Sequence, residues 1–287
     1  MPQDFFITTA DGWQLGASLF EAPGRARGVI VINSAMAVPR NLYAEFAQWW
    51  SERGFHVVTW TYRGMGDSGR AADCDASLAD WGERDLDAVL AWCEGEYPDL
   101  PRVIAAHSVG GQVLGLASRA AGADAIIPIA SQSGYWRHYV GMMRPQVLFL
   151  WYLAIPVLSR LFGYFPSGTL GIFPENIPAH VAREWARWAR DPEYLMGSRG
   201  PESSRNYSRI TAPVLGVWIA DDDMATHSAH QQMLSWYENA PVDRLELHPE
   251  KEGLERIGHF GFFRADRSAE TLWPQLHDWL ASKLENN

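Results

Sequence analysis

The sequence predicts an α/β fold in which a mostly parallel central sheet carries helices on both faces. Short apolar runs alternate with longer amphipathic segments, and this alternation is typical of successive strand–helix–strand units. The run at 28–33 (GVIVIN) contains no polar alternation, as expected for a strand that is buried on both faces of a parallel sheet. A chain of 287 residues with 47% hydrophobic content can form one large core that accepts an insertion.

The predicted elements follow in chain order. Runs at 4–8 and 13–20 are joined by Ala10-Asp11-Gly12, and Asp-Gly between two β-rich runs favours a hairpin. Gly54 and Pro98 each end a helical pattern, because both residues terminate helices. The other predicted strands are 28–33, 55–61, 102–106, 125–129, 214–220 and 242–248. The predicted helices are 41–53, 78–97, 109–121, 227–239 and 268–284.

The alternation stops after residue 130 and resumes at residue 210. The stretch between them has no clear buried strand, many aromatic residues and several helical patterns. Within it, 180–190 is strongly helical and places Trp185 and Trp188 on one side. We therefore predict an α/β core made of 1–130 and 210–287, with a helical, aromatic-rich cap at 131–209 inserted in it.

The net charge, the cysteines and the apolar stretches of the sequence indicate which partners and which cellular compartment to expect. The net charge of −10 disfavours nucleic acid and anionic membrane surfaces as partners. Cys74 and Cys93 have no metal-ligand spacing and suggest a reducing compartment. We see no signal peptide pattern at the start of the sequence. The most apolar stretch, 147–162, is interpreted as too short to span a bilayer and contains Pro156. These observations predict a cytoplasmic protein with no membrane span.

The stretch at 103–112 has the strongest chemical signal. An apolar strand pattern ends at Ala106 and a helical pattern with small residues begins at Val109, so Ser108 lies at the junction, near the positive end of the helix. Gly110 and Gly111 permit close approach of the two elements. This is the pattern of a nucleophile elbow, Gly-x-Ser-x-Gly, with Ala106 in place of the first glycine.

A nucleophilic serine needs a base, and the base needs an orienting acid. In an open parallel sheet, these partners are expected beyond the carboxyl ends of strands. Asp221-Asp222-Asp223 follows the predicted strand 214–220, and His259 follows the last predicted strand. The resulting chain order is Ser, Asp, His.

With these motifs, the chain resembles the α/β-hydrolase superfamily. It is most similar to the lipase-, esterase- and peptidase-like branch known as serine aminopeptidase S33-like, and within that branch to a bacterial subgroup of predicted hydrolases. The segment 213–222 resembles the family's strand and acid, 257–261 its Gly-His loop, and 62–68 its Asp-x-Arg-Gly-x-Gly-x-Ser turn. The resemblance implies a triad of Ser108, Asp222 and His259, with Asp223 as the alternative acid.

An oxyanion hole in such a fold requires two backbone N–H groups. The resemblance implies Val109, which follows the nucleophile, as one donor. The second donor belongs to the loop after the strand 28–33, where relatives usually have His-Gly and this chain has Asn33-Ser34-Ala35-Met36. Met36 is the favoured residue there and Ala35 the alternative.

Several neighbouring residues have plainer interpretations. His107 adjoins the nucleophile, but adjacent strand residues point to opposite faces, so it is given no base role. His227 and His230, near Asp221–Asp223, are interpreted as solvated rather than as metal ligands. Arg63 and Asp67 are expected to shape a turn. No metal or cofactor is expected.

The expected function is that of a serine hydrolase that cleaves an ester, thioester or amide of a small hydrophobic acyl substrate through an acyl-enzyme. One rival is an aminopeptidase, for which cap residues must hold a substrate amine. Other rivals are an acyltransferase and a catalytically silent protein that binds a small ligand. The oligomeric state stays open. The residues that could supply the acidic patch of an aminopeptidase are Glu175, Glu184, Asp191 and Glu193.

Overall fold

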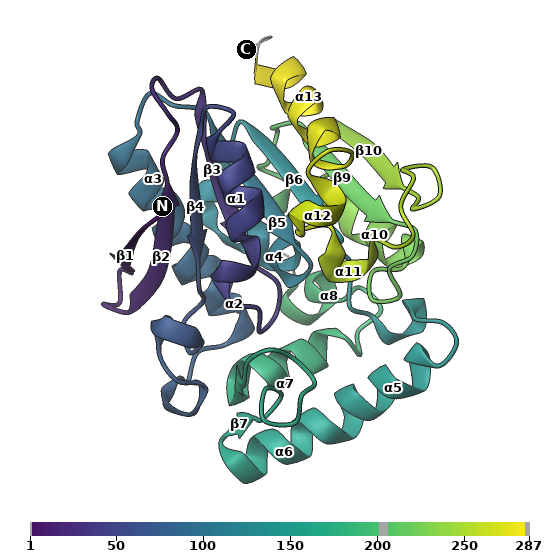
Figure 1. The fold of residues 1–287 in the computed structure, drawn as a ribbon. Helices are drawn as coiled ribbons and strands as arrows, with labels where there is room; N and C mark the ends of the chain where they lie inside the picture. Colours follow the sequence, from purple (N-terminus) through teal and green to yellow (C-terminus); the bar gives the residue numbers. More distant parts are fainter. Residues whose placement is uncertain (1, 201–205, 285–287) are drawn as a thin grey trace.

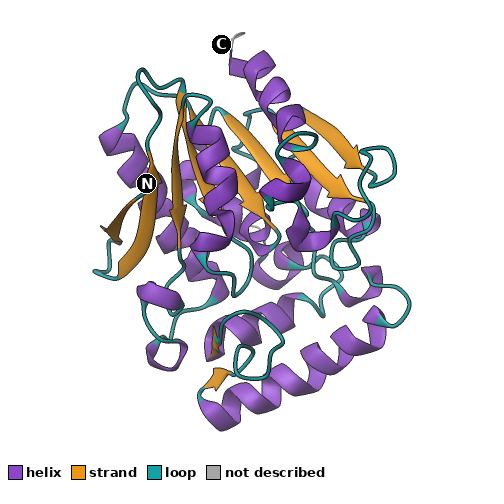
Figure 2. Cartoon of the chain, viewed as in Figure 1, coloured by secondary structure: helices purple, strands orange, loops and turns teal. Residues whose placement is uncertain are grey.

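An eight-stranded sheet forms the centre of the molecule (Figures 1 and 2). The computed structural model describes residues 2–200 and 206–284. The strand order is β1-β2-β4-β3-β5-β6-β9-β10; β1–β2 and β2–β4 pair antiparallel and the other neighbours pair parallel. The sheet strands are β1 Gln3–Thr8, β2 Gln14–Phe20, β3 Gly28–Asn33, β4 Phe55–Trp60, β5 Arg102–His107, β6 Ala125–Ile129, β9 Val214–Ile219 and β10 Val242–Leu247.

Helices cover both faces of this sheet, as the apolar character of β3 predicted. Val29 and Val31 face one hydrophobic cluster and Ile30 and Ile32 face the other, because successive strand residues point to opposite sides. The first cluster is covered by α3 (Asp87–Glu96) and α10 (His227–Leu234), and the second by α1 (Ala44–Ser51) and α13 (Trp273–Leu284). The remaining helices of the core are α2 Leu78–Asp80, α4 Val109–Val113, α11 Gly258–Gly261 and α12 Ala265–Ser268.

Several predicted helices are shorter in the structure: the one expected at 41–53 is Ala44–Ser51, the one expected at 227–239 ends at Leu234, and for two others the structure shows the reason. The helix expected at 109–121 ends at Val113, and Ala117 is extended (φ −71°, ψ 123°). The Tyr207 hydroxyl donates to the carbonyls of Gly111 and Gln112, which a longer helix would use for its own next turn. The closing helix expected from residue 268 begins at Trp273, because Pro274 fits only the first turn of a helix.

The described part of 131–209 adds no strand to the central sheet. It lies beyond the carboxyl ends of the parallel strands, at the bottom of Figure 1. Tyr194 Oη donates to Gln112 Oε1 at 2.7 Å, and Glu184 Oε2 accepts from Ala79 N at 3.0 Å, so this segment is hydrogen-bonded to the core. Its elements are α5 Met143–Phe149, α6 Ile155–Phe162, β7 Tyr164–Phe165, β8 Ile177–Pro178, α7 Ala179–Trp188 and α8 Leu195–Arg199.

The apolar stretch that the sequence marked at 147–162 belongs to a longer helix. Helices α5 and α6 are joined by a π-helical stretch, Leu150–Ala154, into one helix of 20 residues, Met143–Phe162. Pro156 does not break it, because the wider π turn directly before Pro156 accommodates its ring and its missing N–H. By length and composition alone this helix could cross a membrane, so the expectation that it is too short was wrong.

The turn after β4 is held by charged side chains, as expected for Arg63 and Asp67. The Arg63 guanidinium is buried and binds Asp85 at 2.6 Å and Asp11 at 2.7 Å. Burial alone disfavours a guanidinium charge, but these two carboxylates raise the pKa of Arg63. Asp67 accepts from Arg40 at 2.6 Å. Arg63 therefore connects the β1–β2 turn, which contains Asp11, to the helical stretch before α3, which contains Asp85.

Candidate active site

Ser108 occupies a sharp turn between β5 and α4. Its backbone has φ 52° and ψ −117°, a conformation that costs a non-glycine residue about 1–3 kcal/mol and is maintained by the surrounding structure. Gly110 permits it, because a Cβ there would lie 2.4 Å from the Asn33 carbonyl oxygen. The turn places the Ser108 side chain at the carboxyl edge of the sheet, at the N-terminus of α4 and on the wall of a cavity, as a nucleophile elbow requires.

Asp222 and His259 form a buried hydrogen-bonded pair. His259 Nδ1 lies 2.6 Å from Asp222 Oδ2, and the other oxygen of Asp222 accepts from the backbone N–H of Met224 and Ala225. Nδ1 therefore carries the proton, which leaves Nε2 as the acceptor. Asp223, the alternative acid, is exposed to solvent. Among the described residues, no hydrogen bond joins Ser108 Oγ to His259 Nε2, although both residues line one cavity.

Asp221 has a positioning role that the sequence did not reveal. Its carboxylate accepts from the backbone N–H of Ile257 at 3.0 Å and of Gly258 at 2.9 Å. These residues directly precede His259, so Asp221 fixes the loop that carries the imidazole. In the sequence, nothing distinguishes Asp221, which binds the loop, from Asp222, which binds the imidazole.

Two residues of the loop after β3, Ala35 and Met36, line the cavity, and their backbone N–H groups differ. Ala35 N–H donates to Tyr43 Oη at 2.9 Å, whereas Met36 N–H has no hydrogen-bond acceptor among the described residues. Val109 is the first residue of α4, and the first N–H groups of a helix have no partner within it. Of the two candidates in this loop, Met36 is therefore the one whose N–H is available.

His107 and Tyr43 connect this loop to His259. His107 Nε2 lies 3.0 Å from the backbone oxygen of His259, and Nδ1 lies 2.9 Å from Tyr43 Oη. A carbonyl only accepts, so Nε2 must donate; Tyr43 Oη already accepts from Ala35 and donates to Nδ1. Burial, with the neighbouring His259, lowers the pKa of His107 well below its ordinary value, which agrees with this neutral form. His107 has no free nitrogen to act as a base.

The cavity that Ser108 and His259 line is mainly apolar and has a volume of about 370 Å³. Its walls include Met36 from the loop after β3 and Phe260 beside the imidazole, while the inserted segment supplies most of the lining residues. Trp151 and Trp185 pack edge to face there, with ring centroids 4.5 Å apart. The inserted segment contributes Gln132, Tyr139, Met143, Gln146, Val147, Phe149, Leu150, Trp151, Ala154, Ile172, Phe173 and Trp185.

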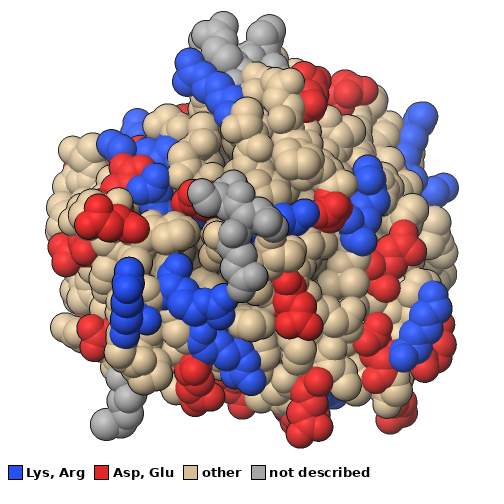
Figure 3. All heavy atoms as spheres, turned by 90° about the horizontal axis from the view of Figure 1, so that it is seen from above, with Lys and Arg blue, Asp and Glu red and all other residues tan. Residues whose placement is uncertain are grey.

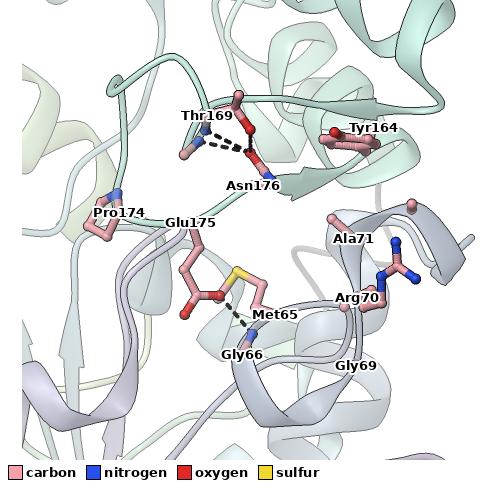
Figure 4. Close-up of a pocket in the computed structure, with 13 residues that line it drawn as sticks. Met65, Gly66, Gly69, Arg70, Ala71, Tyr164, Thr169, Pro174, Glu175 and Asn176 are labelled. Carbon is pink, nitrogen blue, oxygen red and sulfur yellow. Dashed lines mark hydrogen bonds between the residues drawn. The ribbon is translucent and has the colours of Figure 1, made fainter.

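A second cavity, of about 550 Å³, lies between the turn after β4 and the loop at 164–176 (Figure 4). Glu175 Oε2 accepts from Gly66 N at 2.7 Å across it, and Asn176 Oδ1 accepts from the N–H groups of Gly168 and Thr169. Ser108, Asp222 and His259 are absent from its lining. This cavity marks a joint between the inserted segment and the core, away from the acid–base pair.

Residues 2–200 and 206–284 contain no candidate metal site. No group of three or more His, Cys, Asp or Glu side chains is arranged to hold an ion there. His230 is buried, not solvated as its position suggested, and its Nδ1 donates to the Ser131 carbonyl at 2.7 Å. His227 is exposed and faces Glu246.

Comparison with known structures agrees with this architecture. A putative lipase from Acinetobacter baumannii matches 100% of this chain and 93% of its own at 16% identity, with a TM-score of 0.63. An esterase from Exiguobacterium antarcticum matches 99% of this chain and 100% of its own at 16% identity, with a TM-score of 0.62. A thermostable carboxyl esterase from Bacillus coagulans matches 86% of this chain and 90% of its own at 15% identity, with a TM-score of 0.61. At these identities the likeness shows the α/β-hydrolase fold.

Family membership comes from the sequence match. The model of the family described as serine aminopeptidase, S33, matches residues 24–182, which is more than half of the chain and includes the elbow at Ser108. No curated protein matches the sequence significantly. The chain belongs to the serine aminopeptidase S33 family of α/β-hydrolases.

Proposed function

We propose that this hydrolase is a serine carboxylesterase that acts on small hydrophobic acyl substrates. The observation that carries the proposal is the 2.6 Å contact between His259 Nδ1 and Asp222 Oδ2, made beside a strained serine on the wall of an apolar cavity. This arrangement leaves His259 Nε2 as the proton acceptor that a serine nucleophile needs.

In the proposed reaction, Ser108 Oγ attacks the substrate carbonyl carbon as its proton moves to His259 Nε2. The carbonyl oxygen becomes an oxyanion, which accepts hydrogen bonds from the N–H groups of Met36 and Val109. His259 then returns the proton to the departing alcohol and the acyl-enzyme forms. A water molecule, deprotonated by the same imidazole, releases the acid and restores Ser108. Asp222 stabilises the imidazolium in both steps.

The composition of the cavity favours an acyl group over a peptide amine. An aminopeptidase needs a carboxylate that pairs with the substrate ammonium. Neither an Asp nor a Glu is among the described residues that line the cavity. Glu175 and Glu184 instead bind backbone N–H groups of the core. The apolar walls suit a hydrocarbon chain, which gains free energy as it leaves water.

Labelling with a fluorophosphonate probe tests the nucleophile. The wild-type protein should become covalently modified at Ser108, and Ser108→Ala should remain unlabelled. A catalytically silent binding protein would leave both unlabelled. A panel of p-nitrophenyl esters of increasing chain length then tests the substrate class: kcat/KM should rise with acyl length until the cavity is filled, and a flat profile would argue against an apolar acyl site.

A further inference from the structure

The helix Met143–Phe162 has an apolar surface on both of its sides. Its inner side lines the cavity of Ser108 through Val147, Trp151 and Ala154. On its outer side, residues at helical spacing are exposed to solvent, and Leu161 is 72% exposed. A helix that only covered a cavity would present polar residues to water. The exposed apolar residues on this outer face are Phe149, Tyr152, Leu153, Val157, Leu161 and Phe162.

We propose that this outer face docks on a phospholipid bilayer and that apolar substrates enter the cavity from the lipid. The helix would lie in the interface and not span it, since Trp151 and Ile155 are fully buried against the protein. An amphipathic helix of this kind places its apolar side at the headgroup and acyl boundary. The route for substrates rests on the proposed function, whereas the docking does not.

Continuity between the surface and the cavity supports this partner. Phe149 is 60% exposed and Ile172 is 44% exposed, yet both also line the cavity. The mouth of the cavity therefore opens among the apolar residues of the outer face. A bilayer seated there would cover the mouth with hydrocarbon, and an acyl chain would pass inward without crossing water.

The distribution of charge also fits a lipid surface. The whole chain has a net charge of −10, but Arg144 and Arg160 are the only charged residues between 140 and 174. No carboxylate in this stretch repels lipid phosphates, and arginines near the ends of an apolar helix favour the headgroup region. Figure 3 views the molecule from the side opposite to this helix, and that face carries charges of both signs throughout.

A single fluorescent label tests the contact directly. Cys74 and Cys93 are buried, so a cysteine introduced by Val157→Cys can be labelled with an environment-sensitive nitrobenzoxadiazole dye. Phe6→Cys is the matched control, because Phe6 is 57% exposed on β1, outside the inserted segment. With phosphatidylcholine vesicles, the label at residue 157 should brighten several-fold and shift to the blue, and the label at residue 6 should not.

A second variant tests the affinity without disturbing the site. Leu153→Gln/Val157→Gln/Leu161→Gln changes residues that do not line the cavity. It should reduce vesicle partitioning at least 10-fold, while hydrolysis of a soluble short-chain ester stays at the wild-type rate. Ser108→Ala should bind vesicles like wild type, so a failure of the proposed chemistry remains separate from a failure of docking.

Four results would overturn the proposal. One is a label at residue 157 that does not respond to vesicles. Another is equal partitioning of the triple variant and wild type. The third is a blue shift that appears without vesicles as protein concentration rises, together with a dimer in size-exclusion chromatography, which would show that a second copy covers this face. Transfer of bound protein between vesicle populations is expected within minutes, because a surface helix exchanges; its absence would show a spanning helix instead.

Discussion

Tyr43 and His107 share a 2.9 Å hydrogen bond that connects two parts of the candidate site. The Tyr43 hydroxyl also accepts a hydrogen bond from the N–H of Ala35. His107 Nε2 donates to the backbone carbonyl of His259. The loop that offers Met36 and the loop that carries the imidazole are thus fixed to one buried pair. A change in that pair should affect both loops.

Tyr43→Phe should weaken both stability and activity. It leaves the buried Ala35 N–H and His107 Nδ1 without their partner, and each such loss costs about 1–3 kcal/mol. We expect a loss of about 2–4 kcal/mol in urea unfolding and roughly a 10-fold or larger fall in kcat, because catalytic groups tolerate little displacement. Tyr237→Phe is the control, since its buried hydroxyl has no partner among the described residues. Similar losses in the two variants would contradict the role of Tyr43.

Asp222→Asn should separate the two candidate acids. An asparagine amide can donate to His259 Nδ1 and so favours the wrong tautomer, which in other triads lowers kcat by about 10⁴-fold. A loss on the order of 10³- to 10⁴-fold is expected for ester hydrolysis, with little change in KM. Asp223→Asn should leave kcat nearly unchanged, because that side chain is exposed. A larger effect at Asp223 than at Asp222 would refute the assignment.

Local sequence patterns predicted the sheet and the residues at its edge, because these depend on short-range signals. Alternating strands and helices predicted the parallel order, and the loops after two strands predicted the positions of Asp222 and His259. Strand ends in a parallel sheet meet at one edge, so the order of the strands led us to expect these residues at the edge that carries Ser108.

Features that depend on distant partners were not predictable. Helix α4 ends early because Tyr207, more than 90 residues away, binds its carbonyls. The choice between Ala35 and Met36 depends on where the Tyr43 hydroxyl lies. The π turn that carries the long helix past Pro156 has no sequence signature. The strand pattern predicted that His107 is not the catalytic base. It could not predict that His107 contacts the backbone of His259.

Gly110→Ala should disrupt the elbow. The added methyl would lie 2.4 Å from the Asn33 carbonyl and 2.8 Å from the Ser34 carbonyl, and neither backbone atom can move without displacing β3 or its loop. We expect a loss of at least about 1–3 kcal/mol from overpacking and a strong fall in fluorophosphonate labelling. Gly95→Ala is the matched control: it lies exposed in α3 with open space around it. There, alanine should add up to about 1 kcal/mol of stability. Equal behaviour of the two variants would show that the close approach at Gly110 is unimportant.

His230 should make the protein less stable as the pH falls below neutrality. Burial lowers the pKa of His230 from 6.5 to about 4, because the charged imidazolium is poorly solvated there, and the hydrogen bond from Nδ1 to the Ser131 carbonyl offsets only part of this effect. Nε2, which would take up the second proton, is buried without a partner among the described residues. Between these two values the unfolded chain binds the proton and the folded chain does not, so the free energy of unfolding rises with pH across this window. Between pH 6.5 and pH 4, protonation of His230 in the unfolded chain lowers the free energy of unfolding by on the order of 3 kcal/mol. The buried His107 acts in the same direction.

Urea unfolding at several pH values between 7 and 4 measures this dependence. His230→Gln should show a shallower fall than wild type, because glutamine does not titrate, while His107 still contributes. His227→Gln is the control on the same helix: His227 is exposed, so its removal should leave the slope as it is in wild type. If His230→Gln kept the full slope, the proton uptake would have to lie on other groups, and the buried, neutral state of His230 would not be a source of acid sensitivity.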